Sequence, residues 1–144
     1  MMNDITAIAK LAQVYAYRTL KDHDLNGSEY GILSFLAIHQ PVNQDRIADY
    51  MMLDKGTITR IVTKLENKQL ITRQTNPNNK REKLIVATDQ GLEATKAFDA
   101  LTQRWSEQLL NTISPEEQAI AAHVLRKMKD NAKNIIHQQG GSGL

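Results

Sequence analysis

Residues 54–69 carry the feature that most restricts the fold, an apolar stripe opposed by a face without any large apolar side chain. The stripe has the i, i+3, i+4, i+7 spacing of one helix face: Ile58, Ile61, Val62 and Leu65. Asp54 precedes it and is placed to cap the helix. The outward face, with its edges, holds small, hydroxyl or basic residues: Lys55, Gly56, Thr57, Thr59, Arg60, Thr63 and Lys64. The segment predicts a helix that anchors by one face and offers the other to a partner.

Three further helices are predicted before this one. Residues 4–21 form an apolar stripe with Asp4 as a candidate cap, and Asn26-Gly27 marks the turn that follows. Asn26 or Ser28 caps a second helix, which Gln40-Pro41 ends because proline disfavours helical geometry in the residue before it. A short helix over 43–51 buries Ile47, Ala48 and Met51, so two helices joined by a tight turn result.

A β-hairpin with a basic tip is predicted after the fourth helix. Residues 70–75 and 83–88 are rich in β-branched side chains, and they flank the turn-forming segment 76–82, NPNNKRE. Lys80 and Arg81 lie in this tip. The hairpin therefore places a second cluster of positive charge directly after the basic helix.

Two long helices complete the chain. Thr88 or Asp89 caps the first, whose stripe comprises Leu92, Phe98, Leu101, Trp105 and Leu109. Ser114-Pro115-Glu116-Glu117 opens the second, because it combines an N-cap hydroxyl, a proline at the first helical position and acids at the positive end of the helix dipole. Residues 140–144, GGSGL, are expected to be a flexible tail or a scar of expression cloning.

Charge and composition narrow the function classes. Residues 55–83 carry eight basic and two acidic side chains, whereas the whole chain has a net charge of only +2. Such a run alone is often a solvated face, but here it coincides with the helix and the hairpin. The chain has no cysteine, which excludes thiol chemistry, and no apolar run long enough to span a membrane. No secretory signal opens it, so a cytoplasmic protein without a membrane partner is expected.

The basic helix and the hairpin together suit double-stranded DNA. A helix with a small, basic outer face fits a major groove, where Thr57, Thr59 and Arg60 would read base edges. Lys55 and Lys64 would hold phosphates. The hairpin tip, with Lys80 and Arg81, would follow the backbone, and the arginine would enter the adjacent minor groove.

Three segments resemble the MarR-type winged helix-turn-helix transcriptional regulators in order and spacing. They are LNGSEYGILSFL, QDRIADYMMLDKGTITRIVTKLENKQLITR and NPNNKREKLIVATDQG. The sharpest parts are LDKGTITRIVTKLE and the hairpin followed by Thr88-Asp89-Gln90-Gly91, similar to the family's wing and its T-x-x-G junction. The resemblance covers nearly the whole chain.

The resemblance implies a mainly α fold with a small β-hairpin wing. Residues 1–139 would be one subunit, with a DNA-binding lobe over about 28–91 and dimerisation helices over about 4–21 and 92–138. It implies a homodimer that binds a pseudo-palindromic operator, represses transcription by occluding polymerase and responds to a ligand, with no cofactor and no enzyme activity.

An effector pocket for a small aromatic or phenolic molecule is also implied, between the dimer helices and the DNA-reading lobe. Its candidate residues are Tyr15, Arg18, Tyr30 and Trp105, with Phe35 beside them. Aromatic residues at helical spacing are more often core, and Arg18 is equally explained by pairing with Asp22 or by reaching to water.

The sequence departs from the family at two structural points. Asn76 and Asn79 stand where the wing usually carries aspartates, one of which braces a wing arginine, so the rigidity of the tip is in question. Gln69 replaces the glycine usual before Leu70-Ile71, so a left-handed helix end there would cost about 1 kcal/mol, or the local turn differs.

The residues give less support to other functional classes, namely a metal sensor, an enzyme or a protein-interaction module. The four histidines, His23, His39, His123 and His137, have no pair at the i, i+3 or i, i+4 spacing of a helical metal site. No nucleophile elbow, phosphate loop or HExxH motif indicates an enzyme. The remaining alternative is a winged-helix protein–protein interaction module, whose basic face would meet an acidic protein surface.

Overall fold

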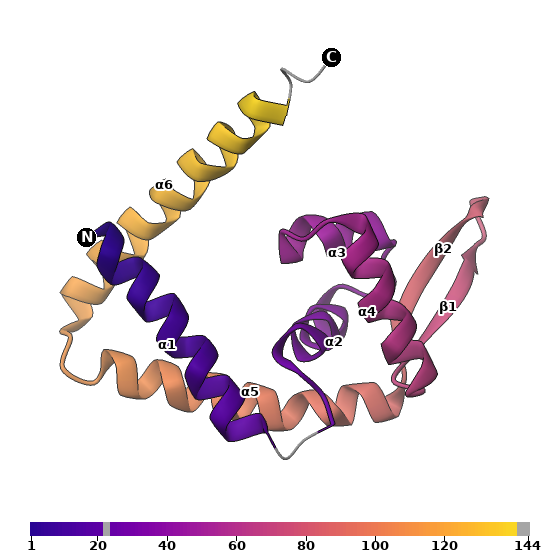
Figure 1. The fold of residues 1–144 in the computed structure, drawn as a ribbon, viewed down its shortest axis with the longest axis horizontal. Helices are drawn as coiled ribbons and strands as arrows, with labels where there is room; N and C mark the ends of the chain where they lie inside the picture. The colour runs from indigo at the N-terminus through magenta and orange to yellow at the C-terminus, as the bar shows by residue number, and fades with distance from the viewer. Residues whose placement is uncertain (22–23, 141–144) are drawn as a thin grey trace. The chain divides into compact units, whose positions relative to one another are not determined.

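Within residues 1–21 and 24–140, which a computed structural model describes, six helices and one hairpin follow in the expected order (Figure 1). Their bounds are α1 (Met2–Leu20), α2 (Gly27–His39), α3 (Gln44–Met51), α4 (Lys55–Asn67), β1 (Ile71–Asn76), β2 (Asn79–Ala87), α5 (Asp89–Leu110) and α6 (Pro115–Gly140). The chain divides into two compact units, residues 1–105 and 106–144. Most of the tail at 140–144, together with Asp22 and His23, lies outside the described residues.

Helix starts coincide with capping side chains. Asn26 is the N-cap of α2 and forms a capping box with Glu29, since each side chain accepts a hydrogen bond from the other's backbone N–H at 2.9 Å. Asp54 caps α4 as predicted, accepting from the backbone of Thr57 at 2.9 Å. Asp4 is not a cap, because α1 begins two residues earlier and places it in the first turn. Local sequence therefore sets where most of these helices begin.

The start of α6 is likewise fixed by its own residues. Ser114 Oγ accepts from the backbone N–H of Glu117 at 3.2 Å, and the Glu117 carboxylate accepts from the backbone N–H of Ser114 at 2.9 Å. This is the S-x-x-E capping box that satisfies two orphan donors at once. The predicted helix start is confirmed, and Glu117 contributes a hydrogen bond beyond its effect on the helix dipole.

Helices α3 and α4 form the predicted helix-turn-helix. The turn begins at Met52, whose φ of 54° is left-handed, and ends at the Asp54 cap. The core of this lobe has its side chains fully or almost fully buried and draws on every element from α2 to β2: Tyr30, Ile32, Leu33, Phe35, Leu36, Val42, Ile47, Ala48, Ile58, Val62, Leu65, Leu70, Ile71, Ile85 and Ala87. Met51 and Ile61, predicted to be buried, are only partly so.

The hairpin is longer than predicted. Its strands pair antiparallel from Ile71 opposite Ala87 out to Asn76 opposite Asn79, so only Pro77 and Asn78 lie outside them. The basic segment assigned to a loop is therefore mostly strand. At its base, Val42 and Ile85 exchange two backbone hydrogen bonds and tie the α2–α3 connection to the wing. This bridge fixes the wing against the lobe that carries α4.

The junction from wing to α5 is closed by the Thr88-to-Gly91 segment. Thr88 caps α5, since its hydroxyl accepts from the backbone N–H of Gly91 at 3.0 Å. A Cβ atom at Gly91 would overlap the backbone carbonyl of Leu70, so only glycine fits this close approach. The glycine of the T-x-x-G pattern thus has a steric cause.

Candidate nucleic-acid interface

Helix α4 lies beside the hairpin in the first unit (Figure 1), and its outward face carries the predicted contact residues. Ile58, Val62 and Leu65 are fully buried and fix the rotation of the helix. The opposite face leaves these side chains exposed: Lys55, Gly56, Thr59, Arg60, Thr63 and Lys64. Thr57 is half-buried. The structure therefore brings the predicted residues of this helix together on the accessible part of one element.

The first turn of α4 holds a hydrogen-bond chain. Thr57 Oγ1 donates to Asp54 Oδ2 at 2.6 Å, and it accepts from Arg60 Nη2 at 3.1 Å. These bonds from Thr57, first through its hydroxyl and then through its backbone, hold the pKa of the Asp54 carboxyl below its usual range. Asp54 is therefore a carboxylate near neutral pH and keeps its role as acceptor.

Two side chains of α3 contact the outward face of α4, and sequence reasoning missed both. Gln44 Nε2 donates to Thr59 Oγ1 at 2.9 Å, while the Thr59 hydroxyl itself donates to the backbone carbonyl of Lys55 at 2.8 Å. Asp45 Oδ1 lies 3.1 Å from Lys55 Nζ in an exposed ion pair. The positive charge of Lys55 is thus partly neutralised by a carboxylate in this structure. Gln44 extends the polar surface of α4 onto α3.

Arg73 of β1 is a third residue that was not predicted as part of the site from the sequence. Its Nη2 donates to Thr63 Oγ1 at 3.0 Å, and its Nε lies 3.3 Å from Glu66 Oε2. The contacts join the first strand of the wing to α4 through two side chains. Arg73 therefore braces the wing against the helix and is less available to a partner than the exposed cations.

The wing tip keeps its basic residues exposed and is braced by asparagines. Lys80 and Arg81 are both exposed. The side-chain carbonyls of Asn76 and Asn79 accept backbone hydrogen bonds two residues later, at 3.0 and 3.2 Å. These Asx-type bonds support the turn without the family's aspartates.

Glu82 links the wing tip to the start of α3. Its carboxylate accepts from Asn43 Nδ2 at 2.7 Å and, through its other oxygen, from Asn76 Nδ2. These two bonds, that from Asn43 being the stronger influence, hold the pKa of the Glu82 carboxyl below its usual range. Asn76 therefore takes part in bracing the wing although it cannot pair with an arginine.

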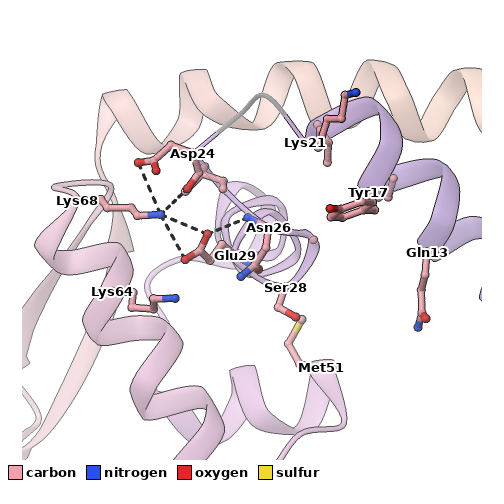
Figure 2. A pocket seen from close by; sticks show the side chains of 14 residues that line it. Gln13, Tyr17, Lys21, Asp24, Asn26, Ser28, Glu29, Met51, Lys64 and Lys68 are labelled. Carbon is pink, nitrogen blue, oxygen red and sulfur yellow. Dashed lines mark hydrogen bonds and ion pairs between the residues drawn. The ribbon is translucent and has the colours of Figure 1, made fainter.

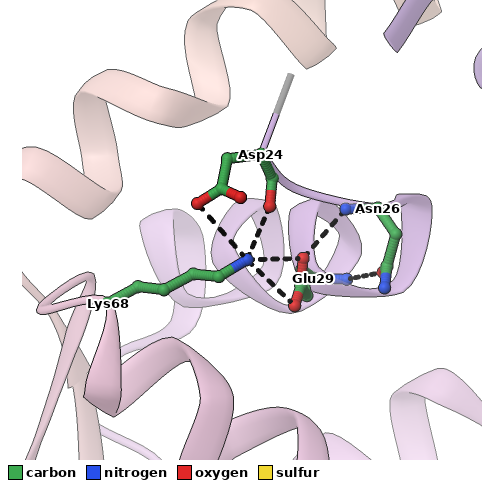
Figure 3. A network of polar contacts seen from close by, with 4 residues as sticks. All are labelled: Asp24, Asn26, Glu29 and Lys68. Atoms are coloured by element: carbon green, nitrogen blue, oxygen red, sulfur yellow. Dashed lines mark hydrogen bonds and ion pairs between the residues drawn. The ribbon is translucent and has the colours of Figure 1, made fainter. Parts of the chain in front are cut away.

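The far end of α4 is attached to α2 by a polar network (Figure 3). Lys68 Nζ donates to the backbone carbonyl of Asp24 at 2.5 Å and lies 3.4 Å from both carboxylate oxygens of Glu29. The Glu29 side chain is only 2% exposed, so its charge depends on the lysine and on the Asn26 backbone N–H. This network connects the C-cap residue of the basic helix to the N-terminus of another helix.

An open cavity of about 880 Å³ lies next to this network (Figure 2). Its wall combines α1, the start of α2, Met51 of α3 and α4, including Tyr17, Lys21, Ser28 and Lys64. A smaller space of about 480 Å³ shares Asp24, Leu25 and Lys68 with it. The structure thus places Lys64, predicted to hold a phosphate, at the cavity wall.

The predicted effector residues mostly pack against other aromatic rings. The rings of Tyr15 and Trp105 lie 4.9 Å apart, and those of Tyr30 and Phe98 are stacked at 5.2 Å. Burial, and then the Glu29 carboxylate, raise the pKa of the Tyr30 phenol.

The predicted effector residues also contribute little to the two cavities. Tyr30 lines the smaller cavity, whereas the larger one has none of Tyr15, Arg18, Tyr30 or Trp105 among its lining residues. Phe35 stacks on Tyr50 at 4.3 Å.

Neither a metal site nor a membrane span is found in the part of the chain that the structure describes. No group of three or more His, Asp or Glu side chains there could hold a metal ion. None of the helices there has both the length and the hydropathy to cross a bilayer.

Comparisons with known proteins agree with this geometry. The family model described as "MarR family" matches residues 25–83, from just before α2 into β2. The HTH-type transcriptional regulator MhqR of Bacillus subtilis (strain 168) is 29% identical over 130 residues, which cover 83% of this chain and 88% of that regulator.

Solved structures share the fold. The crystal structure of the transcriptional regulator SlyA superposes with a TM-score of 0.85 at 25% identity, covering 92% of this chain and 94% of that one. The S. aureus MepR–DNA complex gives a TM-score of 0.83 at 24% identity, covering 90% and 96%. The predicted winged helix-turn-helix fold is confirmed, and the named relatives are transcriptional regulators rather than enzymes.

Proposed function

We propose that the chain is a transcriptional regulator of the MarR family, whose model matches residues 25–83, and that it is a repressor that binds a pseudo-palindromic operator as a homodimer. The observation that carries this proposal is the exposed basic face of α4, anchored by a buried stripe and followed by a braced, basic wing. A helix whose outward side chains are small or basic fits the major groove of B-DNA. Repression would follow from occlusion of polymerase at the operator.

The contact residues are assigned by their chemistry. Arg60 and Thr59 are proposed to meet base edges, because guanidinium and hydroxyl groups match the groove's hydrogen-bonding pattern, and Thr57 lies next to Arg60 in the same interface. Lys55 and Lys64 are proposed to hold phosphates, and the wing's Arg81 to enter the minor groove. The proposed interface is completed by Gly56, Thr63 and Lys80.

A homodimer is proposed from the apolar side chains that each helix outside the DNA-binding lobe leaves exposed. On α1 these include Ile8, Leu11 and Val14, with exposed fractions of 44, 58 and 43%. On α6 they include Ile120 and Ile136, at 66 and 65%. Such surfaces on amphipathic helices are typical of an interface. We therefore propose that residues 4–21 and 92–138 form the dimerisation helices and that residues of about 28–91 form the DNA-binding lobe.

The dimer's symmetry would be repeated in the operator, with half-sites about 10 base pairs apart from centre to centre. A regulator of transcription acts where the chromosome lies, so the cytoplasm is its proposed location.

Response to a small aromatic or phenolic effector is proposed through the cavity of about 880 Å³, because it joins α1 to the helix that reads DNA. A ligand there would relieve repression only by binding the DNA-incompetent arrangement more tightly. Benzoate and phenol are suitable probes, and either should raise the thermal midpoint and weaken operator binding. Tyr17→Ala should reduce this response, whereas Tyr50→Ala, at an exposed tyrosine outside the cavity, should keep it.

Selection of duplexes from a random library by the purified protein tests the main proposal. We expect enrichment of an inverted repeat, and light scattering should give two chains per selected duplex. Absence of any enriched sequence, with equally weak binding of all duplexes, would favour the interaction-module alternative, in which the basic face meets an acidic protein.

A further inference from the structure

We propose that Thr57 and Asp54 act on DNA recognition through Arg60, which they hold in place, and that Thr57 does not itself read a base. This rests on the proposed function only in that Arg60 is taken to contact DNA. The three residues form one chain at the start of α4, with Thr57 in the middle. Asp54 and Thr57 are therefore positioning residues.

The hydroxyl group of Thr57 is already used by its two neighbours in this hydrogen-bond chain. A threonine hydroxyl has one hydrogen to donate, and that of Thr57 goes to Asp54 Oδ2 at 2.6 Å. Its oxygen accepts from Arg60 Nη2 at 3.1 Å. Thr57 is also half-buried. An acceptor on a base edge would have to displace the bond to Asp54 before it could use the hydroxyl hydrogen, and a donor on a base edge would have to share the oxygen with Arg60.

The anchor of the chain is fixed by the helix itself. Asp54 is the N-cap residue, and its second oxygen accepts from the backbone N–H of Thr57 at 2.9 Å. The carboxylate is thereby bound to both the backbone and the side chain of the same threonine. This geometry sets the rotamer of Thr57, and the direction of its accepting oxygen follows.

Arg60 gains preorganisation from this arrangement. One of its five N–H donors is used by Thr57, and the remaining four stay available on an exposed side chain. A long side chain loses rotamer freedom when it binds, so an arginine held beforehand loses less. Lys64, on the same helix, has no ion pair or hydrogen bond of this kind among the described residues and shows no comparable bracing.

The test is a double-mutant cycle on the affinity ratio between a selected duplex and its scramble. Arg60→Ala should lower the ratio by about 10-fold or more, the usual worth of one good base contact. Thr57→Val should lower it in the same direction, whereas Thr57→Ser, which keeps the hydroxyl, should stay within about twofold of wild type. In the Arg60→Ala background, Thr57→Val should have almost no further effect.

Asp54→Asn is the second variant, since asparagine preserves the cap but cannot accept the Thr57 hydroxyl with its amide nitrogen. It should lower the ratio as Thr57→Val does. Thermal unfolding midpoints of all variants should remain close to wild type, which separates positioning from loss of structure. If Thr57→Val has the same effect with and without Arg60, Thr57 contacts DNA by itself and the proposal is wrong.

A DNA-free measurement separates this proposal from the proposed function. In ¹⁵N relaxation of the free protein, Arg60 Nε should be restrained in wild type and Thr57→Ser, and mobile in Thr57→Val. Equal mobility in all three would overturn the inference even if the protein selects an operator. Restraint lost in Thr57→Val, in a protein that selects no duplex, would support the positioning chain and refute the DNA-reading role.

Discussion

The hydroxyl of Thr88 donates to the backbone carbonyl of Gln69 at 2.8 Å and so joins the start of α5 to the end of α4. Leu70, between α4 and the wing, adds a second link, because its carbonyl accepts from the backbone N–H of Thr88 at 3.0 Å. Helix α4 is thereby held at the point where the wing begins and ends. Gln69 adopts a left-handed φ of 61° to make this possible.

Gln69→Gly should stabilise the protein. A residue with a Cβ in the left-handed region is strained relative to glycine by about 1 kcal/mol, and the turn keeps this conformation despite the glutamine. Chemical denaturation should show a rise of about that size in the free energy of unfolding. Asn67→Gly is the matched control, two residues earlier in the last turn of α4, and should lower the free energy of unfolding slightly, by about 0.3 kcal/mol. A loss of stability in both variants would contradict the strain argument.

Gly91→Ala should be strongly destabilising, since the new Cβ would overlap the carbonyl of Leu70. Overpacking of this kind costs about 3 kcal/mol when the neighbour is backbone and cannot move aside. Gly27→Ala offers the control, because a Cβ there meets nothing within 4 Å. Thermal unfolding of the two variants should differ widely. Equal midpoints would show that the α4–wing junction can relax.

Lys68→Met should lower the free energy of unfolding by about 2 kcal/mol, because it leaves the buried Glu29 carboxylate without its cation, discounted for the lysine's partial exposure. Glu29→Gln keeps a capping-box side chain, and combining it with Lys68→Met should restore part of the loss. Lys64→Met, an exposed lysine on the same helix, should change little. Additive effects of the two substitutions would mean that Lys68 and Glu29 are not coupled.

Asp45→Asn should strengthen DNA binding. The substitution frees Lys55 from its ion pair and removes a negative charge beside the proposed phosphate contact. For an exposed pair the expected gain is about two- to fivefold in affinity, larger at low salt. Asp49→Asn makes the same charge change on the same helix without an ion pair among the described residues. If both variants gain equally, the effect is that of net charge alone.

Local chemistry made the helix-turn-helix predictable. Each helix start that was assigned correctly depends on a side chain within three residues, as with Asp54 and Ser114. The outward face of α4 was predictable because the apolar stripe lies within the same helix and fixes which side is buried. The wing was underestimated because asparagines and charged residues are typical of loops, whereas both faces of an isolated two-stranded ribbon can be exposed and polar.

Pairs distant in sequence were not predictable. Lys68 and Glu29 are 39 residues apart, and Gln44 and Thr59 are 15 apart, so no periodicity connects them. Their meeting depends on how α2, α3 and α4 pack. The ring contact between Tyr15 of α1 and Trp105 of α5, which were predicted from the sequence to line an effector pocket, also depends on how helices pack.

The most direct test of the central claim is the affinity ratio between the selected duplex and its scramble at about 0.15 M salt, for wild type and Arg60→Ala. We expect a ratio of about 10³ or more for wild type, and a fall of about 10-fold or more on loss of the arginine. A fall in the ratio at nearly constant binding to the scramble would place sequence readout on α4. A wild-type ratio near one would contradict the account, because the basic face would then hold DNA by charge alone or meet another partner.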